Sequence, residues 1–327
     1  MVADDEDARR EFVADATGIE RIPIVDRAQW LELRKQDVTA STVAALFGMH
    51  PYQTIAGLHA EKHGVEFDQV DPEAEVVRRG LVLETVVAGE VARLRPEWQI
   101  ERANVYLRDR RLRLGATPDF FILGDPRGRG VLQTKTVGAT KYKRDFGEDG
   151  TTPPFWMTAQ CLTEMHLDGA AFGALGILVL GEFTFKTVVI EVPRHPAAER
   201  KITAAVAQFW VTSTAGEVPA IDYERDGALL AVMFPEAEPG KVVDLRSDNR
   251  IGELLERRER LGEEMKTSKT ELEMIDTELK EKLGDAEGAL VRGWRLTFKT
   301  IRRKAYEVKA TAFRQLRVVR EDQPSAT

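Results

Sequence analysis

The run Gly115-Ala-Thr-Pro-Asp119-Phe-Phe-Ile-Leu-Gly124, followed by Val131-Leu-Gln-Thr-Lys-Thr-Val137, decides the fold. The apolar residues after Asp119 predict a short strand, and residues 131–137 predict a second strand. Between them, Asp125-Pro-Arg-Gly-Arg-Gly130 is rich in turn-forming residues. The sequence therefore predicts a β-hairpin with polar residues at its edge.

The polar residues of this hairpin suit metal-assisted hydrolysis of a phosphodiester. Gln133 and Lys135 are two residues apart, so their side chains leave the same face of the strand, and Asp119 can reach the same space. A carboxylate binds hard ions such as Mg²⁺ or Mn²⁺, which activate water, and a lysine neutralises developing charge. Glu84 could add a carboxylate, and Gln160 could hold a phosphate or a water. From the spacing alone, an ordinary ion pair between a strand aspartate and a lysine is the commoner reading.

Hydrophobic periodicity outside the hairpin predicts alternating helices and strands. Their order is helix, strands, helix, strands, helix, which fits an α/β fold with a mixed central sheet flanked by helices. The expected helices are a segment from residue 29 and residues 39–48, 76–94, 155–167 and 196–212, and the expected strands are 103–107, 112–115, 174–179 and 183–192.

The pattern also predicts how the chain is divided. Apolar residues repeat every seven positions over 251–283, which indicates a heptad helix that either pairs as a coiled coil or packs on its own domain. Gly284 ends it, and residues 289–300 alternate like a strand. The expected divisions are an acidic mobile tail at 1–28, the core at 29–222, a linker at 223–250, and a long-helix and short β appendage at 251–327.

Composition narrows the class of protein without fixing it. The net charge is −7, which argues against a surface coated with positive charge but allows a basic groove. Two basic clusters flank the polar hairpin, and both a solvated face and a DNA contact remain open for each. They are Arg108, Arg110, Arg111 and Arg113, and Lys141, Lys143 and Arg144.

The single cysteine, Cys161, excludes an intrachain disulfide and a cysteine-bound zinc or iron–sulfur centre. The acidic N-terminus is unlike a secretory or mitochondrial leader, and the longest apolar run, residues 170–180, is too short to span a bilayer. We therefore expect a soluble, cytoplasmic protein.

Five motifs in order resemble the YqaJ-type viral recombinase family, which is related to phage lambda exonuclease and belongs to the PD-(D/E)XK nuclease superfamily. The resemblance covers most of residues 29–222, and Phe209-Trp210 and Gly216–Asp222 continue it. The motifs are Arg34…Thr39-Ala-Ser41…Gly48, Arg79-Gly80…Glu84, Gly115-Ala-Thr-Pro-Asp119, Val131-Leu-Gln-Thr-Lys135 and Pro154…Gln160.

The resemblance implies a PD-(D/E)XK restriction-endonuclease-like core that uses Mg²⁺ to digest linear double-stranded DNA from its ends, commonly 5′ to 3′. It further implies transfer of the remaining strand to a single-strand annealing protein, a ring-like trimer, and a phage or prophage origin in a bacterial cytoplasm. Carried over, the metal ligands would be Glu84, Asp119, Gln133 and the Thr134 carbonyl, the other catalytic residues Lys135 and Gln160, and the phosphate- or DNA-binding residues Arg34, Ser41, Thr117, Lys141, Lys143 and Arg144.

Gln133 departs from the family pattern, which expects a glutamate. An amide oxygen can bind a metal but brings no negative charge, whereas Mg²⁺ usually binds carboxylates. Three explanations stay open: a tolerated glutamine, an inactivating substitution, and a natural DNA-end binder that has lost cleavage. A nuclease for single strands or branched junctions is a further alternative, because the motifs do not separate these substrates.

Overall fold

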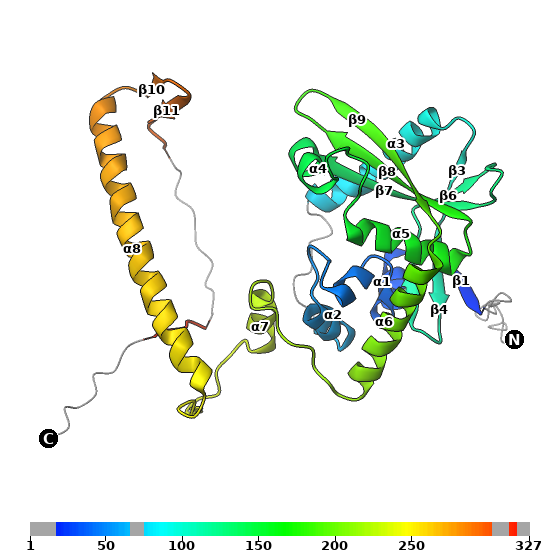
Figure 1. The fold of residues 1–327 in the computed structure, drawn as a ribbon, viewed down its shortest axis with the longest axis horizontal. Coiled ribbons are helices and arrows are strands. Elements are labelled where there is room, and N and C mark those ends of the chain that lie inside the picture. Colours follow the sequence, from blue (N-terminus) through cyan, green and yellow to red (C-terminus); the bar gives the residue numbers. More distant parts are fainter. Residues whose placement is uncertain (1–17, 66–74, 303–313, 319–327) are drawn as a thin grey trace, which may run out of the picture. The chain divides into compact units, whose positions relative to one another are not determined.

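The computed structural model describes residues 18–65, 75–302 and 314–318, and the chain divides into two compact units between Met233 and Phe234. The first unit is a mixed α/β structure with helices on both faces of a sheet (Figure 1). The predicted fold class is therefore confirmed. Within the described ranges, no helix combines the length and apolarity that a membrane crossing requires.

The central sheet has five strands in the order β3-β6-β7-β8-β9. β7 and β8 are parallel, and the other neighbouring pairs are antiparallel, so the sheet is mixed as predicted. Its strands are β3 (Gln99–Arg102), β6 (Phe120–Leu123), β7 (Gly130–Gly138), β8 (Phe172–Leu180) and β9 (Phe185–Pro193). The β6–β7 pair is the hairpin that the opening motif predicted.

Alternation along β7 assigns its side chains to two different cores. Val131 and Val137 belong to the core cluster that contains residues of α5 (Phe155–Asp168), whereas Leu132 packs in the cluster that contains residues of α3 (Glu75–Leu94). Because side chains two apart share a face, Gln133 and Lys135 leave β7 on the α5 side.

The helix α5 is the crossover between the parallel strands β7 and β8, which such a connection requires. It ends at Gly169, whose φ of 73° lies in the left-handed region. A short helix, α4 (Ala139–Asp145), precedes it. The helix α6 (Pro196–Thr214) then packs against α5 and η1 (Val43–Phe47).

A second, smaller sheet has the order β1-β4-β5-β2. Its first strand lies inside residues 1–28, which the sequence predicted as a tail; it forms because Ile19 and Ile22 are buried and the strand pairs with β4. The rest of that range up to residue 17 lies outside the described residues. The bounds of the elements in this layer are β1 (Ile19–Pro23), α1 (Arg27–Gln36), β2 (Val38–Thr39), α2 (Ile55–Lys62), β4 (Val105–Asp109) and β5 (Leu114–Ala116).

Two glycines permit close approaches that the site depends on. A Cβ on Gly115 would lie 1.9 Å from the Tyr106 hydroxyl oxygen, so the glycine of the opening motif makes room for that ring. A Cβ on Gly176 in β8 would lie 2.8 Å from Cγ2 of Val91, so this glycine allows α3 to pack closely on the sheet. Non-bonded heavy atoms in a packed interior do not approach so closely, so a larger residue at either position would force its neighbours to move.

A short helix, α7 (Gly227–Met233), lies within the predicted linker at 223–250; Leu229 buries itself against Ala56 and Ala60 of α2. The second unit contains α8 (Asn249–Leu283), which begins and ends close to the predicted heptad helix and has no buried residue among those described. The predicted strand at 289–300 is instead a hairpin of β10 (Gly288–Val291) and β11 (Trp294–Thr297). Gly293, at φ 81°, makes the turn.

Candidate active site

The edge of the β6–β7 hairpin holds Asp119 in place through one oxygen. Oδ2 of Asp119 accepts hydrogen bonds from Nε2 of Gln133 at 2.8 Å and from the backbone nitrogen and Oγ1 of Thr134, both at 2.7 Å. Three donors on one oxygen fix the carboxylate against β7. Asp119 also lines the cleft described below.

Gln133 is buried, with 3% of its surface exposed. Its Oε1 finds no hydrogen-bond donor among the residues that the structure describes. A buried acceptor without a donor lowers the stability of the folded chain unless another polar group or an ion compensates it. A cation beside Asp119 would do so, and therefore the orphaned amide oxygen fits the predicted metal site.

Glu84 on α3 supplies the second carboxylate. Its Oε2 accepts a hydrogen bond from Nη1 of Arg102 at 3.2 Å, and its side chain is 24% exposed. Burial raises the pKa of the Glu84 carboxyl above its usual value, the charge of Asp119 raises it further, and Arg102 opposes both. A cation between the two carboxylates would relieve their repulsion.

Lys135 and Gln160 complete the predicted catalytic group. Nζ of Lys135 lies 5.6 Å from the ring centroid of Trp156, near the start of α5. Gln160, one turn further along α5, donates from Nε2 to Oε1 of Glu164 at 3.0 Å. The helix α5 therefore faces the same side of β7 as Gln133 and Lys135.

Two clefts meet at Asp119 and Glu84. One, of about 260 Å³, is lined by both carboxylates together with Gly80, Gln133 and Lys135, among others. The other, of about 380 Å³, brings both carboxylates together with three further predicted residues, Arg34, Thr117 and Gln160, and is also lined by Trp30. Ser41, Lys141, Lys143 and Arg144 line neither cleft. Residues predicted from widely separated segments thus surround one space.

Arg34 on α1 is held at the far side of this cleft. Its Cζ lies 4.6 Å from the Trp30 ring centroid, and its Nη2 donates to Oγ of Ser41 at 3.2 Å. Nε1 of Trp30 in turn donates to Oγ1 of Thr117 at 3.0 Å. Burial lowers the pKa of Arg34, yet guanidinium stays charged in proteins, so this cluster presents a cation with hydroxyl groups around it.

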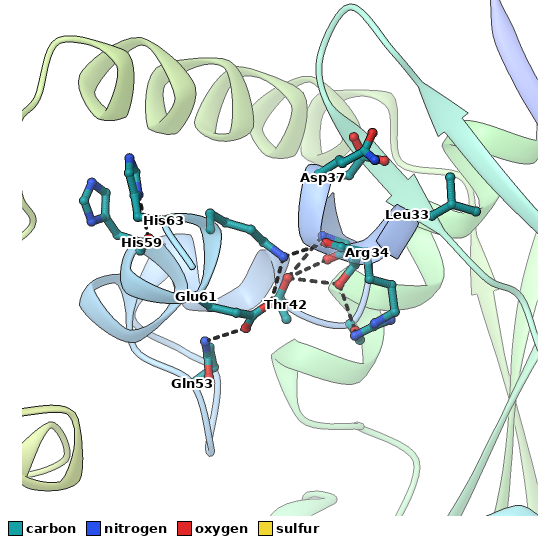
Figure 2. A network of polar contacts seen from close by, with 12 residues as sticks. Leu33, Arg34, Asp37, Thr42, Gln53, His59, Glu61 and His63 are labelled. Atoms are coloured by element: carbon teal, nitrogen blue, oxygen red, sulfur yellow. Dashed lines mark hydrogen bonds and ion pairs between the residues drawn. The ribbon is translucent and has the colours of Figure 1, made fainter. Parts of the chain in front are cut away.

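The backbone beneath Arg34 is anchored by a buried amine (Figure 2). Nζ of Lys62 donates to the Arg34 carbonyl at 2.7 Å and pairs with Glu61 at 2.8 Å, while its side chain is only 1% exposed. Glu61 also accepts from Gln53 at 3.3 Å. This network joins α2 to the end of α1 and thereby orients Arg34.

The two basic clusters differ in how far their side chains are buried and paired. Arg108 is buried against Asp37, with Nε 3.0 Å from Oδ2, and Arg110 pairs with Glu20 at 3.1 Å. Arg113 lies 3.4 Å above the Trp210 ring. Arg108 and Arg113 are therefore tied into the packing around the small sheet, whereas the side chains of Arg110 and Arg111 are 70% and 84% exposed, and a DNA contact by this cluster stays a prediction.

The second cluster lies on α4, directly after β7. Nζ of Lys141 donates to the Tyr52 hydroxyl at 2.6 Å, Arg144 pairs with Asp145 at 2.6 Å, and Lys143 is exposed. These side chains are exposed or half-buried, so their role in DNA binding stays a prediction.

The donor set around Asp119 suits a hard divalent ion. It consists of carboxylate and amide oxygens without sulfur or imidazole, as Mg²⁺ and Mn²⁺ prefer. In the described part of the chain, however, no three His, Cys, Asp or Glu side chains group closely enough to hold a metal. Gln133 stands where a third carboxylate was expected. Thr134 contacts Asp119 through its N–H and hydroxyl, and the role of its carbonyl stays a prediction.

One family model matches the sequence of this region. The model of the YqaJ-like viral recombinase domain matches residues 29–171, which include every residue assigned above to the carboxylate, lysine and Arg34 groups. Residues 29–171 are therefore similar to the YqaJ-like viral recombinase domain.

Solved structures similar to the YqaJ-like chain include exonucleases. An alkaline exonuclease from Laribacter hongkongensis is 20% identical at a TM-score of 0.45, covering 58% of this chain and 94% of that one. Its complex with dAMP is 19% identical at a TM-score of 0.44, with the same coverage. The structure of SSO0001 is 13% identical at a TM-score of 0.34, covering 67% and 99%. No curated protein matches the sequence.

Three residues of the YqaJ-like domain's site were not predicted from the sequence. Arg102 pairs with Glu84, Lys62 anchors Arg34, and Glu164 accepts from Gln160. Only Glu164 carried a signal, because it lies four residues after Gln160 and therefore on the same helix face. The other two come from elements that the pattern did not predict, β3 and α2.

Proposed function

We propose that the chain is an exonuclease that uses Mg²⁺, or Mn²⁺, to degrade linear double-stranded DNA from its ends in the 5′ to 3′ direction. The product is a single strand for phage-type recombination, handed to a single-strand annealing protein. One observation carries the proposal: Glu84, Asp119 and Gln160 share a cleft with Arg34 and Thr117. A phosphate gripped at one side of this cleft would leave a neighbouring phosphodiester beside the carboxylates.

The contacts of each residue support a separate role for it. Asp119, Glu84 and the Gln133 amide oxygen would hold the metal ion. When bound, that ion supplies activation of the attacking water and stabilisation of charge on the phosphate. Lys135, above Trp156, orients the water or neutralises the developing oxyanion. Gln160 lies within the cleft and holds a phosphate oxygen or a water through its amide.

Arg34 and its hydroxyl neighbours suit a terminal phosphate. A guanidinium matches phosphate oxygens with parallel donors, and Ser41 already lies at 3.2 Å from it. Ser41 and Thr117 add short hydroxyl donors. Recognition of the end by this cluster would explain why cutting starts at an end.

Digestion of duplexes tests this proposal. A 5′-phosphorylated linear duplex, a hydroxyl-ended duplex and a closed circle are incubated with Mg²⁺ or Mn²⁺ and with EDTA. The variants are the given chain, Lys135→Ala, Gln133→Glu, and Lys201→Ala on the exposed face of α6 as a matched loss of charge. We expect metal-dependent loss of both linear duplexes, faster for the phosphorylated one, and no loss of the closed circle. Lys135→Ala abolishes this activity and Lys201→Ala leaves it unchanged. Labelling each end distinguishes the polarity.

A second candidate rests on the Gln133 contact. Because the amide donates to Asp119, the glutamine can be read as a structural replacement in a protein that binds DNA ends without cutting. Cleavage by Gln133→Glu alone would show a disabled nuclease. Cleavage by neither form, with retained binding to ends, would favour the binding protein. Cleavage of single strands or junctions in preference to duplex ends would replace the substrate but keep the chemistry.

A further inference from the structure

One face of α5 is directed at the carboxylate site. Trp156, Gln160 and Glu164 follow one another at four-residue intervals and therefore lie on one side of the helix. Lys135 lies over the first of them, and the second lines the cleft that Asp119 also lines. The third, Glu164, lies one turn deeper along the same face.

Glu164 is a completely buried carboxylate, with 0% of its surface exposed. Its Oε1 accepts the hydrogen bond from Gln160, but its Oε2 has no hydrogen-bond partner within the described residues, which also provide no ion pair to it. Burying a carboxylate without a cation costs several kcal/mol. Glu164 therefore weakens the folded chain unless another group compensates it.

Asp168, one turn later on α5, shows how a buried carboxylate is usually neutralised by cationic side chains. It is also buried, but Arg21 and Arg129 bind its two oxygens at 3.0 and 2.9 Å. The helix thus carries two buried acids of opposite character. One is held by arginines, and the other is hydrogen-bonded to Gln160 and has one oxygen without a partner among the described residues.

Position 133 carries an amide where a carboxylate was expected, and Glu164 carries a buried carboxyl that no cation among the described residues pairs. Oε1 of Gln133 and Oε2 of Glu164 are both buried and both without a donor among the described residues. They approach the site from β7 and from the helix packed on it. Burial raises the pKa of Glu164 well above its usual value; the charge of Asp119 raises it further, and Lys135 acts in the opposite direction. The carboxyl is therefore within electrostatic reach of both.

We propose that Glu164 is a positioning residue that supplies, from behind Gln160 and ionised when a cation is bound, the buried negative charge missing at position 133 of the metal site. This inference rests on the proposed metal-dependent function. Its charge favours a cation beside Asp119, and its hydrogen bond fixes the Gln160 amide that faces the cleft. It acts through space and through Gln160, because no three acids of the described chain converge on one point.

Mn²⁺ binding to the full chain tests the inference without relying on cleavage. Titration calorimetry gives the affinity, and thermal melts in EDTA and in Mn²⁺ give the stability of each form. The variants are the given chain, Glu164→Gln, the charge relocation Gln133→Glu/Glu164→Gln, and Asp168→Asn as the matched buried acid on the same helix.

We expect Glu164→Gln to weaken Mn²⁺ binding by about 10- to 100-fold, the range for groups that support metal ligands. In EDTA its melting temperature is equal or higher, because a buried carboxyl that no cation pairs has been removed. The charge relocation recovers most of the affinity. Asp168→Asn does the reverse: it melts earlier in EDTA and binds Mn²⁺ unchanged.

Two results would overturn the inference while leaving the proposed function intact. One is Mn²⁺ binding by Glu164→Gln equal to that of the given chain, and the other is a relocation variant that binds no better than Glu164→Gln. A lower melting temperature of Glu164→Gln in EDTA with unchanged affinity would make Glu164 a purely structural residue. If the given chain binds no Mn²⁺ at all, the proposed function fails, and this inference fails with it.

Discussion

Nε2 of Gln133 lies 2.8 Å from Oδ2 of Asp119 and donates a hydrogen bond to it. A glutamate at the same position would place a second carboxylate against Asp119 and would lose that donor. The amide therefore stabilises the metal-free site, and a glutamate would stabilise only the metal-loaded one.

The variant Gln133→Glu is expected to lower stability in EDTA by about 1–3 kcal/mol, because it replaces a hydrogen bond to a charged group by repulsion. Saturating Mn²⁺ should restore most of that loss. Urea unfolding in EDTA and in Mn²⁺ measures both. Equal stability of the two proteins in EDTA would contradict the expectation.

Arg34→Gln should remove the preference for phosphorylated ends. A hydrogen bond to a charged group contributes about 1.5–3 kcal/mol, so cleavage of a 5′-phosphorylated duplex should fall about 10- to 100-fold. Cleavage of a hydroxyl-ended duplex should change little. Initial rates on both substrates provide the comparison, and an equal loss on both would assign Arg34 a different role.

Arg108 holds the small sheet together through a buried ion pair. Its Nε lies 3.0 Å from Oδ2 of Asp37, which also accepts from the Tyr106 hydroxyl at 3.1 Å. Arg108→Met leaves the acid unpaired and should cost about 3–5 kcal/mol. Arg110→Ala removes a pair whose arginine is 70% exposed and should cost at most about 1 kcal/mol. Similar losses from both variants in urea unfolding would count against this assignment.

His50 makes the stability depend on pH. Burial, mainly, lowers its pKa from the usual 6.5 to about 4, and Nδ1 accepts from the Tyr52 backbone nitrogen. Between pH 4 and 6.5 the unfolded chain binds the proton more readily, so the contribution is complete above pH 6.5 and is lost as the pH falls. His50→Gln should flatten the melting temperature over this window. An unchanged slope would place the titration elsewhere.

Gly176→Ala should destabilise the first unit by about 1–3 kcal/mol, because the new Cβ overlaps Val91 on α3. Gly80, on the same helix as Val91, offers the opposite control. A Cβ there meets nothing within 4 Å, so Gly80→Ala should stabilise the helix by about 0.5–1 kcal/mol. Thermal melts of the two variants should move in opposite directions. A gain in stability for Gly176→Ala would show that α3 can retreat from β8 without loss.

The sequence was most informative where pattern and chemistry coincide. The β6–β7 hairpin, α3, α5 and α8 were predicted close to their bounds, because each has a strong period or a clear turn. The elements β3, α2 and α4 were missed. They are four to eight residues long, and tertiary contacts stabilise them more than their own apolar pattern does.

The candidate site likewise has one part that the motifs predicted and another that only the structure shows. Motif order predicted which residues would surround Asp119, and the structure brings Glu84, Gln133, Lys135 and Gln160 to it. The unpaired state of Glu164 could not be predicted, because a helical glutamate looks the same in sequence whether solvent or protein surrounds it. Nor could the pairing of Arg108 with Asp37, which are 71 residues apart.

The parallel pairing of β7 with β8 has a consequence for how the site comes into being. Its side chains come from α3, the β6–β7 hairpin and α5, and the crossover helix reaches its place only when strands 42 residues apart in register, such as Val131 and Gly173, have paired. Contacts of this kind form late, because the loop entropy must be lost before they add stability. In a nascent or partly folded chain the candidate site is therefore not assembled, and recovery of the proposed activity on refolding should report the last tertiary step.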